Sequence, residues 1–247
     1  MCLITWAWKA HPRYQLILAA NRDEFMDRPA EPAHWWTDAP GIFAGRDKRA
    51  GGTWMGITRS GRFAAITNYR QMDMAFPAGP SRGQLVREAL EHDIAPPGTA
   101  AYAGFNLIYG PIGKLRYHNN IDGRDEALTP GIHGLSNALL DTPWPKVVKA
   151  KEQLSRCLQQ PDKLLVSGLF TLLADDTRAP DDQLPDTGLP IEAERAASPI
   201  LIRTSIGYGT RCSTVVLVDP KGRVYVEERE LGSAQGRVVE EFEIRPD

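Results

Sequence analysis

The chain has 247 residues, of which 42% are apolar and 24% charged, and its formal net charge is −2. This composition is typical of a globular protein that can bury a sizeable core, and we expect a single domain spanning residues 1–247. The lack of a basic footprint argues against a nucleic-acid partner. Three scattered cysteines favour a reducing, cytoplasmic location over a disulfide framework. No run reaches the ~18 apolar residues of a transmembrane segment.

The N-terminal part of the chain predicts a sheet followed by a helix. Residues 2–9 and 14–20 are almost continuously apolar, which indicates two strands that are covered on both faces. Polar residues 21–24 follow the second strand, and residues 25–40 form a proline-punctuated connection. Beyond this connection we expect a short strand at 42–44, a hairpin of 53–58 with 62–67, and a helix over 81–93.

The second part of the chain predicts two strands, two helices and then more strands. Apolar runs at 104–110 and 114–119 indicate strands, and Pro145 stands where a helix should begin. A second helical stretch covers 162–173, and the acidic, proline-rich segment 175–190 is typical of an exposed loop. The remaining predicted strands are 200–204, 210–218, 223–229 and 238–244. Strand-rich ends around central helices favour an α+β layered domain.

Cys2 is the first candidate for chemistry. If Met1 is removed, Cys2 carries both a thiol and a free α-amine, which can act as a nucleophile and its base. The alternative is that a small residue is merely tolerated after the initiator methionine. Cys157 lies in a predicted helix and is better explained by packing, whereas Cys212 follows Arg211 directly.

Several polar residues stand at predicted strand ends and could complete such a site. Asn68 and Asn137 could donate N–H groups to a tetrahedral oxyanion. Asp23 could hold the α-ammonium group, and Arg211 could stabilise a thiolate. Each residue also has an ordinary structural explanation, because asparagine favours turns and arginine often pairs with surface carboxylates.

We expect further residues to bind a ligand beside these groups. Asn21 and Arg22 follow the same strand as Asp23, and Trp54 and Tyr69 could contact a flat or acyl ligand. Ordinary core packing is the alternative for the two aromatic residues. The acidic residues near position 23 match no hard-metal loop pattern, so no metal site is predicted.

Six motifs distributed over most of the chain carry a family resemblance. They are the start MC, LAANRDEF, GGTWMGI with GRFAAITNYR, SRG before a helix, GLSN with DTPWPKV, and GTRCSTVVLVD. Together these motifs resemble the NRDE family, which is also named for transport and Golgi organization. The resemblance implies the α+β fold of the N-terminal-nucleophile (Ntn) hydrolases, a four-layer αββα sandwich of two antiparallel sheets.

The NRDE family in turn resembles, more distantly, the cysteine amidases that cleave bile-salt and penicillin amides. This resemblance implies a hydrolase of a non-peptide C–N amide bond, with the following residues in the site: Cys2 as nucleophile, Asp23, Asn68, Asn137 and Arg211. The chain departs from the amidase pattern at the first arginine, where it has Ala20. Arg22 lies two positions further along the strand, on the same face, and is the candidate substitute.

A binding or carrier protein on the same fold is the alternative function. The family has been linked to haem trafficking and to lipid or acyl-CoA homeostasis, so haem is a candidate ligand although no cofactor is required. The expected partners are therefore a small-molecule amide, haem or an acyl ligand. The sequence does not determine the oligomeric state.

Overall fold

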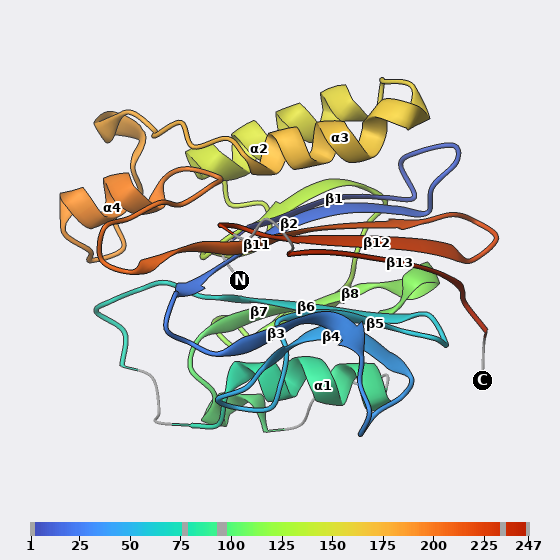
Figure 1. Cartoon of the computed structure of the whole chain (residues 1–247). Helices are drawn as coiled ribbons and strands as arrows, with labels where there is room; N and C mark the ends of the chain where they lie inside the picture. Colours follow the sequence, from blue (N-terminus) through green and yellow to red (C-terminus); the bar gives the residue numbers. More distant parts are fainter. Residues whose placement is uncertain (1–2, 76–78, 93–97, 233–235, 246–247) are drawn as a thin grey trace.

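Two antiparallel sheets lie face to face in the computed structural model, which describes residues 3–75, 79–92, 98–232 and 236–245 (Figure 1). The first sheet has the strand order β10-β1-β2-β11-β12-β13, and the second runs from β3 to β9 in sequence order. The strands of the first sheet are β1 (Leu3–Trp8), β2 (Leu16–Phe25), β10 (Gly131–Leu135), β11 (Tyr208–Val218), β12 (Arg223–Glu230) and β13 (Arg237–Glu243). Those of the second are β3 (Ala30–Trp35), β4 (Ile42–Asp47), β5 (Met55–Thr58), β6 (Arg62–Asn68), β7 (Phe105–Pro111), β8 (Arg116–Asn119) and β9 (Asp125–Ala127).

Helices cover the outer faces of both sheets. Helices α2 (Pro145–Cys157) and α3 (Asp162–Leu173) pack on the first sheet, and α1 (Arg82–His92) packs on the second (Figure 1). The short helix α4 (Ile191–Ala197) lies at one end of the first sheet. The predicted α+β sandwich of two antiparallel sheets is confirmed. Within the described ranges, no helix is both long and apolar enough to cross a membrane.

The central strands β1 and β2 bury both of their faces, as their continuous apolar runs predict. One face packs beneath α2 and α3, and the other packs against the second sheet. The side chains beneath the helices include Leu3, Ala7, Ile17 and Ala19. Those between the sheets include Ile4, Trp6, Leu16 and Leu18. This double burial explains why neither strand shows a polar alternation.

The structure differs from the sequence-based prediction in one strand boundary, one predicted strand and one predicted connection. Strand β2 continues to Phe25 instead of ending at Ala20, because β11 extends the pairing through residues 21–25. Residues 200–204 form only one isolated bridge, between Arg203 and Gly209. The proline-rich connection 25–40 contains β3, which is an edge strand whose register shifts between Glu31 and His34. An edge strand with a bulge is a position where a proline can be accommodated within a sheet.

Candidate functional site

The NRDE segment is the last part of β2, and its neighbouring side chains point to opposite faces of the sheet. Asn21 reaches the helical side, where its Nδ2 donates to the carbonyl oxygen atoms of Leu173 and Ile200, at 2.9 Å each. Arg22 reaches the space between the sheets and contacts Trp54. The alternation therefore separates Asn21 from Arg22, although both were predicted to bind a ligand.

Arg22 is held against an aromatic platform. Its guanidinium carbon lies 4.1 Å from the centre of the Trp54 ring, and the residue is only 5% exposed. Burial lowers the pKa of Arg22 from its ordinary value. Trp54 in turn depends on Gly45, because a Cβ atom at that position would lie 2.3 Å from Cζ2 of the indole. The strand β4 thus leaves room for the ring.

Two glycines join the GGTW motif to the SRG motif. A Cβ atom on Gly52 would lie 2.4 Å from the carbonyl carbon of Gly83, so the two backbones can approach only without a side chain. Thr53 N donates a 3.2 Å hydrogen bond to Gly83 O at this crossing. The contact places the start of α1 beside Trp54, and residues 81–83 line the same cavity as Trp54.

A cavity of about 450 Å³ opens beside these residues, and Arg22, Trp54 and Asn68 all line it. Its described lining also contains residues that were not predicted for the site: Glu24, Arg28, Asp47 and Arg82. Arg28 lies 2.5 Å from Asp47 and 3.7 Å from Glu24. Burial disfavours the Asp47 carboxylate, but the hydrogen bonds from Arg28 and Arg49 N and the nearby arginine charges together outweigh burial and lower the pKa. Glu24 belongs to the NRDE motif, whereas no sequence pattern links Arg28 or Asp47 to it.

The two predicted asparagines are joined to each other. Asn137 is buried, and its Nδ2 donates a 2.9 Å hydrogen bond to the backbone oxygen of Asn68. Asn137 O accepts a hydrogen bond from Arg70 N at 2.7 Å. Arg70 continues the TNYR motif and forms a 2.9 Å ion pair with the buried Glu194 of α4. The asparagine pair is thereby fixed to both sheets and to α4.

Asp23 lies on the helical side of the sheet, at the joint between β2 and β11. Its Oδ1 accepts a 2.6 Å hydrogen bond from Thr210 Oγ1, which itself accepts one from Ile202 N at 2.9 Å. Both Asp23 and Thr210 are buried. The threonine therefore connects the aspartate to the loop that leads into β11.

Arg211 is the extra residue of a β-bulge. Thr210 pairs with Asp23 and Cys212 pairs with Arg22, so Arg211 has no counterpart on β2. Its Nη1 donates to the backbone oxygen atoms of Phe25 and Arg28, at 3.1 and 2.6 Å. Such bulges redirect side chains, often next to active sites. Arg211 lines a hollow of about 30 Å³ that it shares with Arg22 and Trp54.

Cys212 and Glu228 lie buried in the same small hollow. Cys212 Sγ lies 3.6 Å from Glu228 Oε2, and burial together with this carboxylate raises the pKa of the thiol. The pKa of Glu228 is also raised, chiefly by burial. The nearby arginines therefore do not make Cys212 a reactive thiolate, although its position after Arg211 suggested this.

The structure brings together Arg22, Trp54 and Asn68 in one cavity, with Asn137 bonded to Asn68 and Arg211 in the adjoining hollow. Asn21 points elsewhere, and Tyr69 does not belong to the described lining of the cavity. Cys2 lies outside the described residues. Its covalent neighbour Leu3 begins β1 and pairs with Asn21 of β2.

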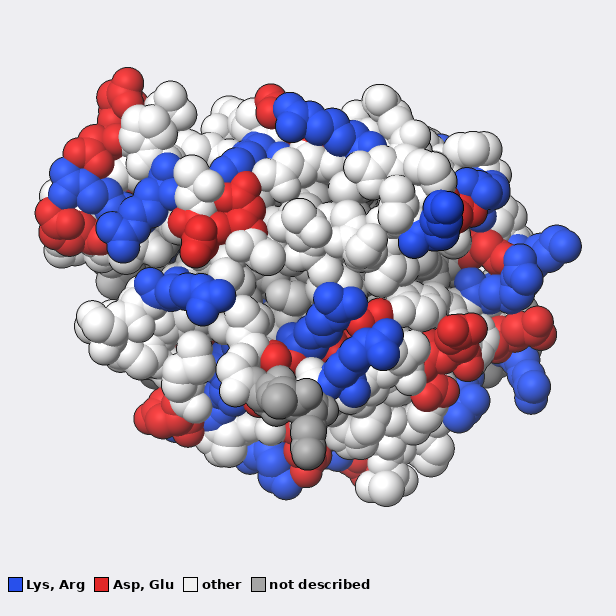
Figure 2. All heavy atoms as spheres, turned by 45° about the horizontal axis from the view of Figure 1, so that its top comes forward, with Lys and Arg blue, Asp and Glu red and all other residues white. Residues whose placement is uncertain are grey.

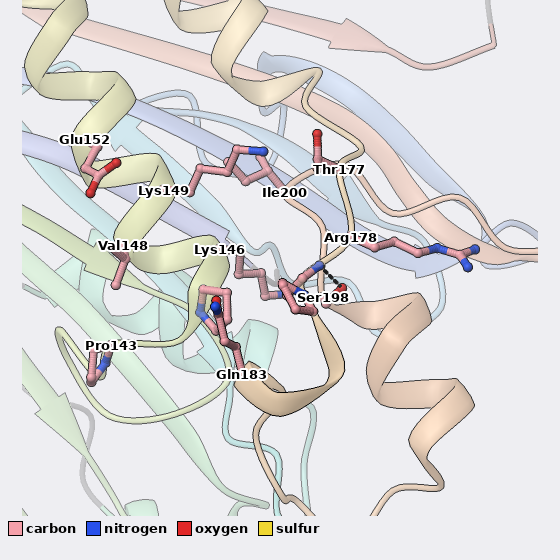
Figure 3. A pocket seen from close by; sticks show the side chains of 13 residues that line it. Pro143, Lys146, Val148, Lys149, Glu152, Thr177, Arg178, Gln183, Ser198 and Ile200 are labelled. Carbon is pink, nitrogen blue, oxygen red and sulfur yellow. Dashed lines mark hydrogen bonds between the residues drawn. The ribbon is translucent and has the colours of Figure 1, made fainter.

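A second cavity of about 540 Å³ lies between α2 and the segment around residues 177–200 (Figure 3). Its charged groups are engaged or directed outward. Lys146 donates to Ala197 O at 2.9 Å, and Lys149 forms a 2.6 Å ion pair with Asp175. Figure 3 shows Arg178 extending away from the two lysines. On the face drawn in Figure 2, acidic and basic side chains are interspersed and form no extended patch of one sign.

The fold resembles that of an amide-hydrolysing enzyme of known structure. The Caenorhabditis elegans N-acylethanolamine-hydrolyzing acid amidase ortholog superposes with a TM-score of 0.52 over 87% of this chain and 92% of the amidase, at 12% sequence identity. Together with the two facing antiparallel sheets between helices, this likeness defines the fold as that of the N-terminal-nucleophile hydrolases.

The chain belongs to the Transport and Golgi organisation 2 family, whose model matches residues 1–233. The Transport and Golgi organization 2 homolog of Mus musculus is 35% identical over 259 residues, which cover 94% of this chain and 93% of the relative. The Homo sapiens homolog is also 35% identical over 258 residues, with the same coverage. The Drosophila melanogaster protein of this name is 28% identical over 265 residues. The family predicted from the sequence motifs is confirmed.

Proposed function

We propose that this protein hydrolyses a non-peptide C–N amide bond, with Cys2 as the nucleophile after removal of Met1. The observation that carries the proposal is the register around the head of β1. Leu3 pairs with Asn21 on one side, and Ile4 pairs with Leu135 on the other. Asp23 and Asn137 each lie two residues beyond these partners in the sequence, and Leu3 is the residue to which Cys2 is covalently joined.

In this reaction the Cys2 thiol would attack the amide carbonyl, with its proton passing to the α-amine. The N–H groups of Asn137 and Asn68 are candidates for stabilising the oxyanion. The α-ammonium group, held by Asp23, would return the proton to the leaving amine. A water molecule would then hydrolyse the thioester and regenerate the thiol. The likeness to the nematode amidase supports the fold required for this chemistry and not a particular substrate.

Haem or acyl-ligand binding is the alternative function. Haem iron in proteins is held by histidine, cysteine, methionine or tyrosine. The part of the 450 Å³ cavity that the structure describes offers none of these side chains, and five of its lining residues are charged. The residues present therefore do not fit an axially ligated haem, and haem binding stays a prediction without support from this cavity.

Brief alkylation followed by intact mass spectrometry tests the identity of the nucleophile. Cys157 is buried and burial raises the pKa of its thiol, and Cys212 is also buried with a raised thiol pKa. Iodoacetamide should therefore add a single label to a chain that lacks Met1, and Cys2→Ala should abolish this label. Retention of Met1, or labelling that is unchanged in Cys2→Ala, would contradict the proposal.

Turnover is tested separately with an activated ester such as p-nitrophenyl hexanoate. We expect an acylated intermediate on Cys2 and release of more than one equivalent of p-nitrophenol per chain. Asn137→Ala should slow acylation by about 100-fold, the usual effect of losing one oxyanion donor. Cys157→Ala is the matched control and should retain the rate. A burst of one equivalent without further turnover would indicate a protein that binds and does not hydrolyse.

A further inference from the structure

We propose that Arg22 binds a carboxylate group of the ligand, so that the 450 Å³ cavity selects monoanionic molecules. That the ligand contains an amide bond rests on the function proposed above, whereas that it contains a carboxylate is inferred from Arg22 alone.

The guanidinium N–H groups of Arg22 have no acceptor within the described part of the chain. The residue is only 5% exposed, lines the cavity and contacts the Trp54 ring. It forms no hydrogen bond or ion pair with any residue that the structure describes. A guanidinium group carries five N–H donors, and a buried charge that lacks a counterion is costly. A ligand oxyanion in the cavity would remove this cost.

Three carboxylates near Arg22 are already engaged by other groups. Asp47 accepts two hydrogen bonds from Arg28, and Glu24 lies within ion-pair distance of the same arginine. Glu228 Oε1 accepts a 2.8 Å hydrogen bond from Ala33 N. Glu228 Oε2 is within reach of Thr214 Oγ1 at 3.3 Å and of the Cys212 thiol. Burial favours the neutral form of Glu228, which weakens it further as a counterion.

The platform fixes how an anion can approach. Contact with Trp54 at 4.1 Å covers one face of the guanidinium, so acceptors must come to its N–H edge. A carboxylate matches that edge with two parallel hydrogen bonds. The described lining holds three arginines and two carboxylates, an excess of one positive charge. A single negative charge therefore balances the cavity, which favours a carboxylate over a doubly charged phosphate.

Matched probes that differ by one charge test this selectivity. Hippurate and hippuramide have nearly the same size and shape, and only hippurate carries a carboxylate. Binding of each probe to the full chain carrying Cys2→Ala would be measured by calorimetry, because this variant lacks the proposed nucleophile. We expect hippurate to bind at least about tenfold more tightly than hippuramide. Phenyl phosphate forms a third arm and should bind more weakly than hippurate.

Variants then assign the preference to Arg22. Arg22→Gln should bring the hippurate-to-hippuramide ratio close to one, and Arg22→Lys should leave an intermediate ratio because the charge remains without the planar fork. Arg178→Gln, an exposed arginine in the other cavity, removes the same charge and should leave the ratio unchanged. Thermal melting of each variant establishes that it is folded. If Arg22→Gln does not fold, the binding ratio of Arg22→Lys is compared with that of the parent chain instead.

Three results would overturn the inference: equal binding of hippurate and hippuramide, no binding of hippurate at 10 mM, or the same loss of preference in Arg178→Gln as in Arg22→Gln. Because the assay measures binding to a chain without Cys2, its outcome is independent of hydrolysis. If the protein selects hippurate through Arg22 but never turns over an ester, this inference holds and the proposed function is contradicted. If the protein turns over an ester without preferring the anion, the proposed function holds and this inference is overturned.

Discussion

Thr210 Oγ1 donates a 2.6 Å hydrogen bond to Asp23 Oδ1 across the joint between β11 and β2. The same hydroxyl accepts a hydrogen bond from Ile202 N, so one threonine satisfies two buried polar groups at once. The joint lies one residue before the bulge that carries Arg211. The position of the proposed catalytic aspartate is therefore tied to the shape of β11.

Replacing Thr210 with valine preserves the shape of the side chain and removes both hydrogen bonds. We expect Thr210→Val to lower the free energy of unfolding by about 2 kcal/mol, because a buried donor and a buried carboxylate oxygen each lose a partner. Urea denaturation measures this change. Thr210→Ser keeps the hydroxyl and should retain most of the stability; equal losses in both variants would show that the methyl group and not the hydroxyl matters.

Gly45→Ala tests the space reserved for Trp54. The added methyl group would overlap the indole, which must then leave its present position beside Arg22. We expect a loss of about 2 kcal/mol in the free energy of unfolding and a shift in tryptophan emission. Gly41→Ala is the matched control, because nothing lies within 4 Å of a Cβ atom at that position. A wild-type emission spectrum in Gly45→Ala would contradict the proposed contact.

Substitution of Asn21 is expected to lower the stability of the protein and not to remove a ligand contact, although the sequence suggested such a contact. Asn21→Asp would place carboxylate oxygens against the carbonyl oxygens of Leu173 and Ile200, and should cost about 3 kcal/mol of stability. Ser213→Ala removes only the 2.7 Å hydrogen bond to Asn21 Oδ1 and should cost about 1 kcal/mol. Denaturant unfolding of each variant would measure these losses of stability. A stable Asn21→Asp that loses only ligand binding would restore the original interpretation.

His133 should make stability depend on pH. Burial disfavours its charged form, but the hydrogen bonds to Asp141 and to Thr129 O outweigh burial and raise the pKa. Both ring nitrogens face acceptors, which suits the protonated imidazole. Its stabilisation is thus complete below the unfolded pKa of 6.5 and declines as pH rises through the folded value.

The urea midpoint of the wild type should therefore fall from pH 6 to pH 8.5 more steeply than that of His133→Gln. The exposed His92 provides the control, since His92→Gln should follow the wild-type curve. Asp141 acts in the opposite range, because burial opposes its charge while His133 and Lys151 lower its pKa to about 2. Its contribution is lost only as pH falls below about 4 towards 2. Parallel curves for the wild type and His133→Gln would refute the role of His133.

Motifs predicted the family, and periodicity predicted much of the fold. The continuous apolar runs of β1 and β2 correctly indicated strands covered on both faces, since only such strands lack polar alternation. Local patterns did not reveal that β2 continues through the polar residues to Phe25, or that Pro32 lies within a strand. The first depends on pairing with β11, which is far away in the sequence, and the second on a register shift in the pairing of β3 with β4 that leaves Pro32 outside the ladder.

The sequence alone identified the candidate residues for chemistry: a cysteine after Met1, an aspartate, two asparagines and two arginines. Only the tertiary structure decided how they are grouped. Strand alternation turned Asn21 to the helices and Arg22 to the cavity, and a bulge gave Arg211 its place. Arg28 engages Glu24 and Asp47, so Arg22 has no ion-pair partner among the residues that the structure describes. No linear spacing could show this, because all four groups meet only when the two sheets pack together.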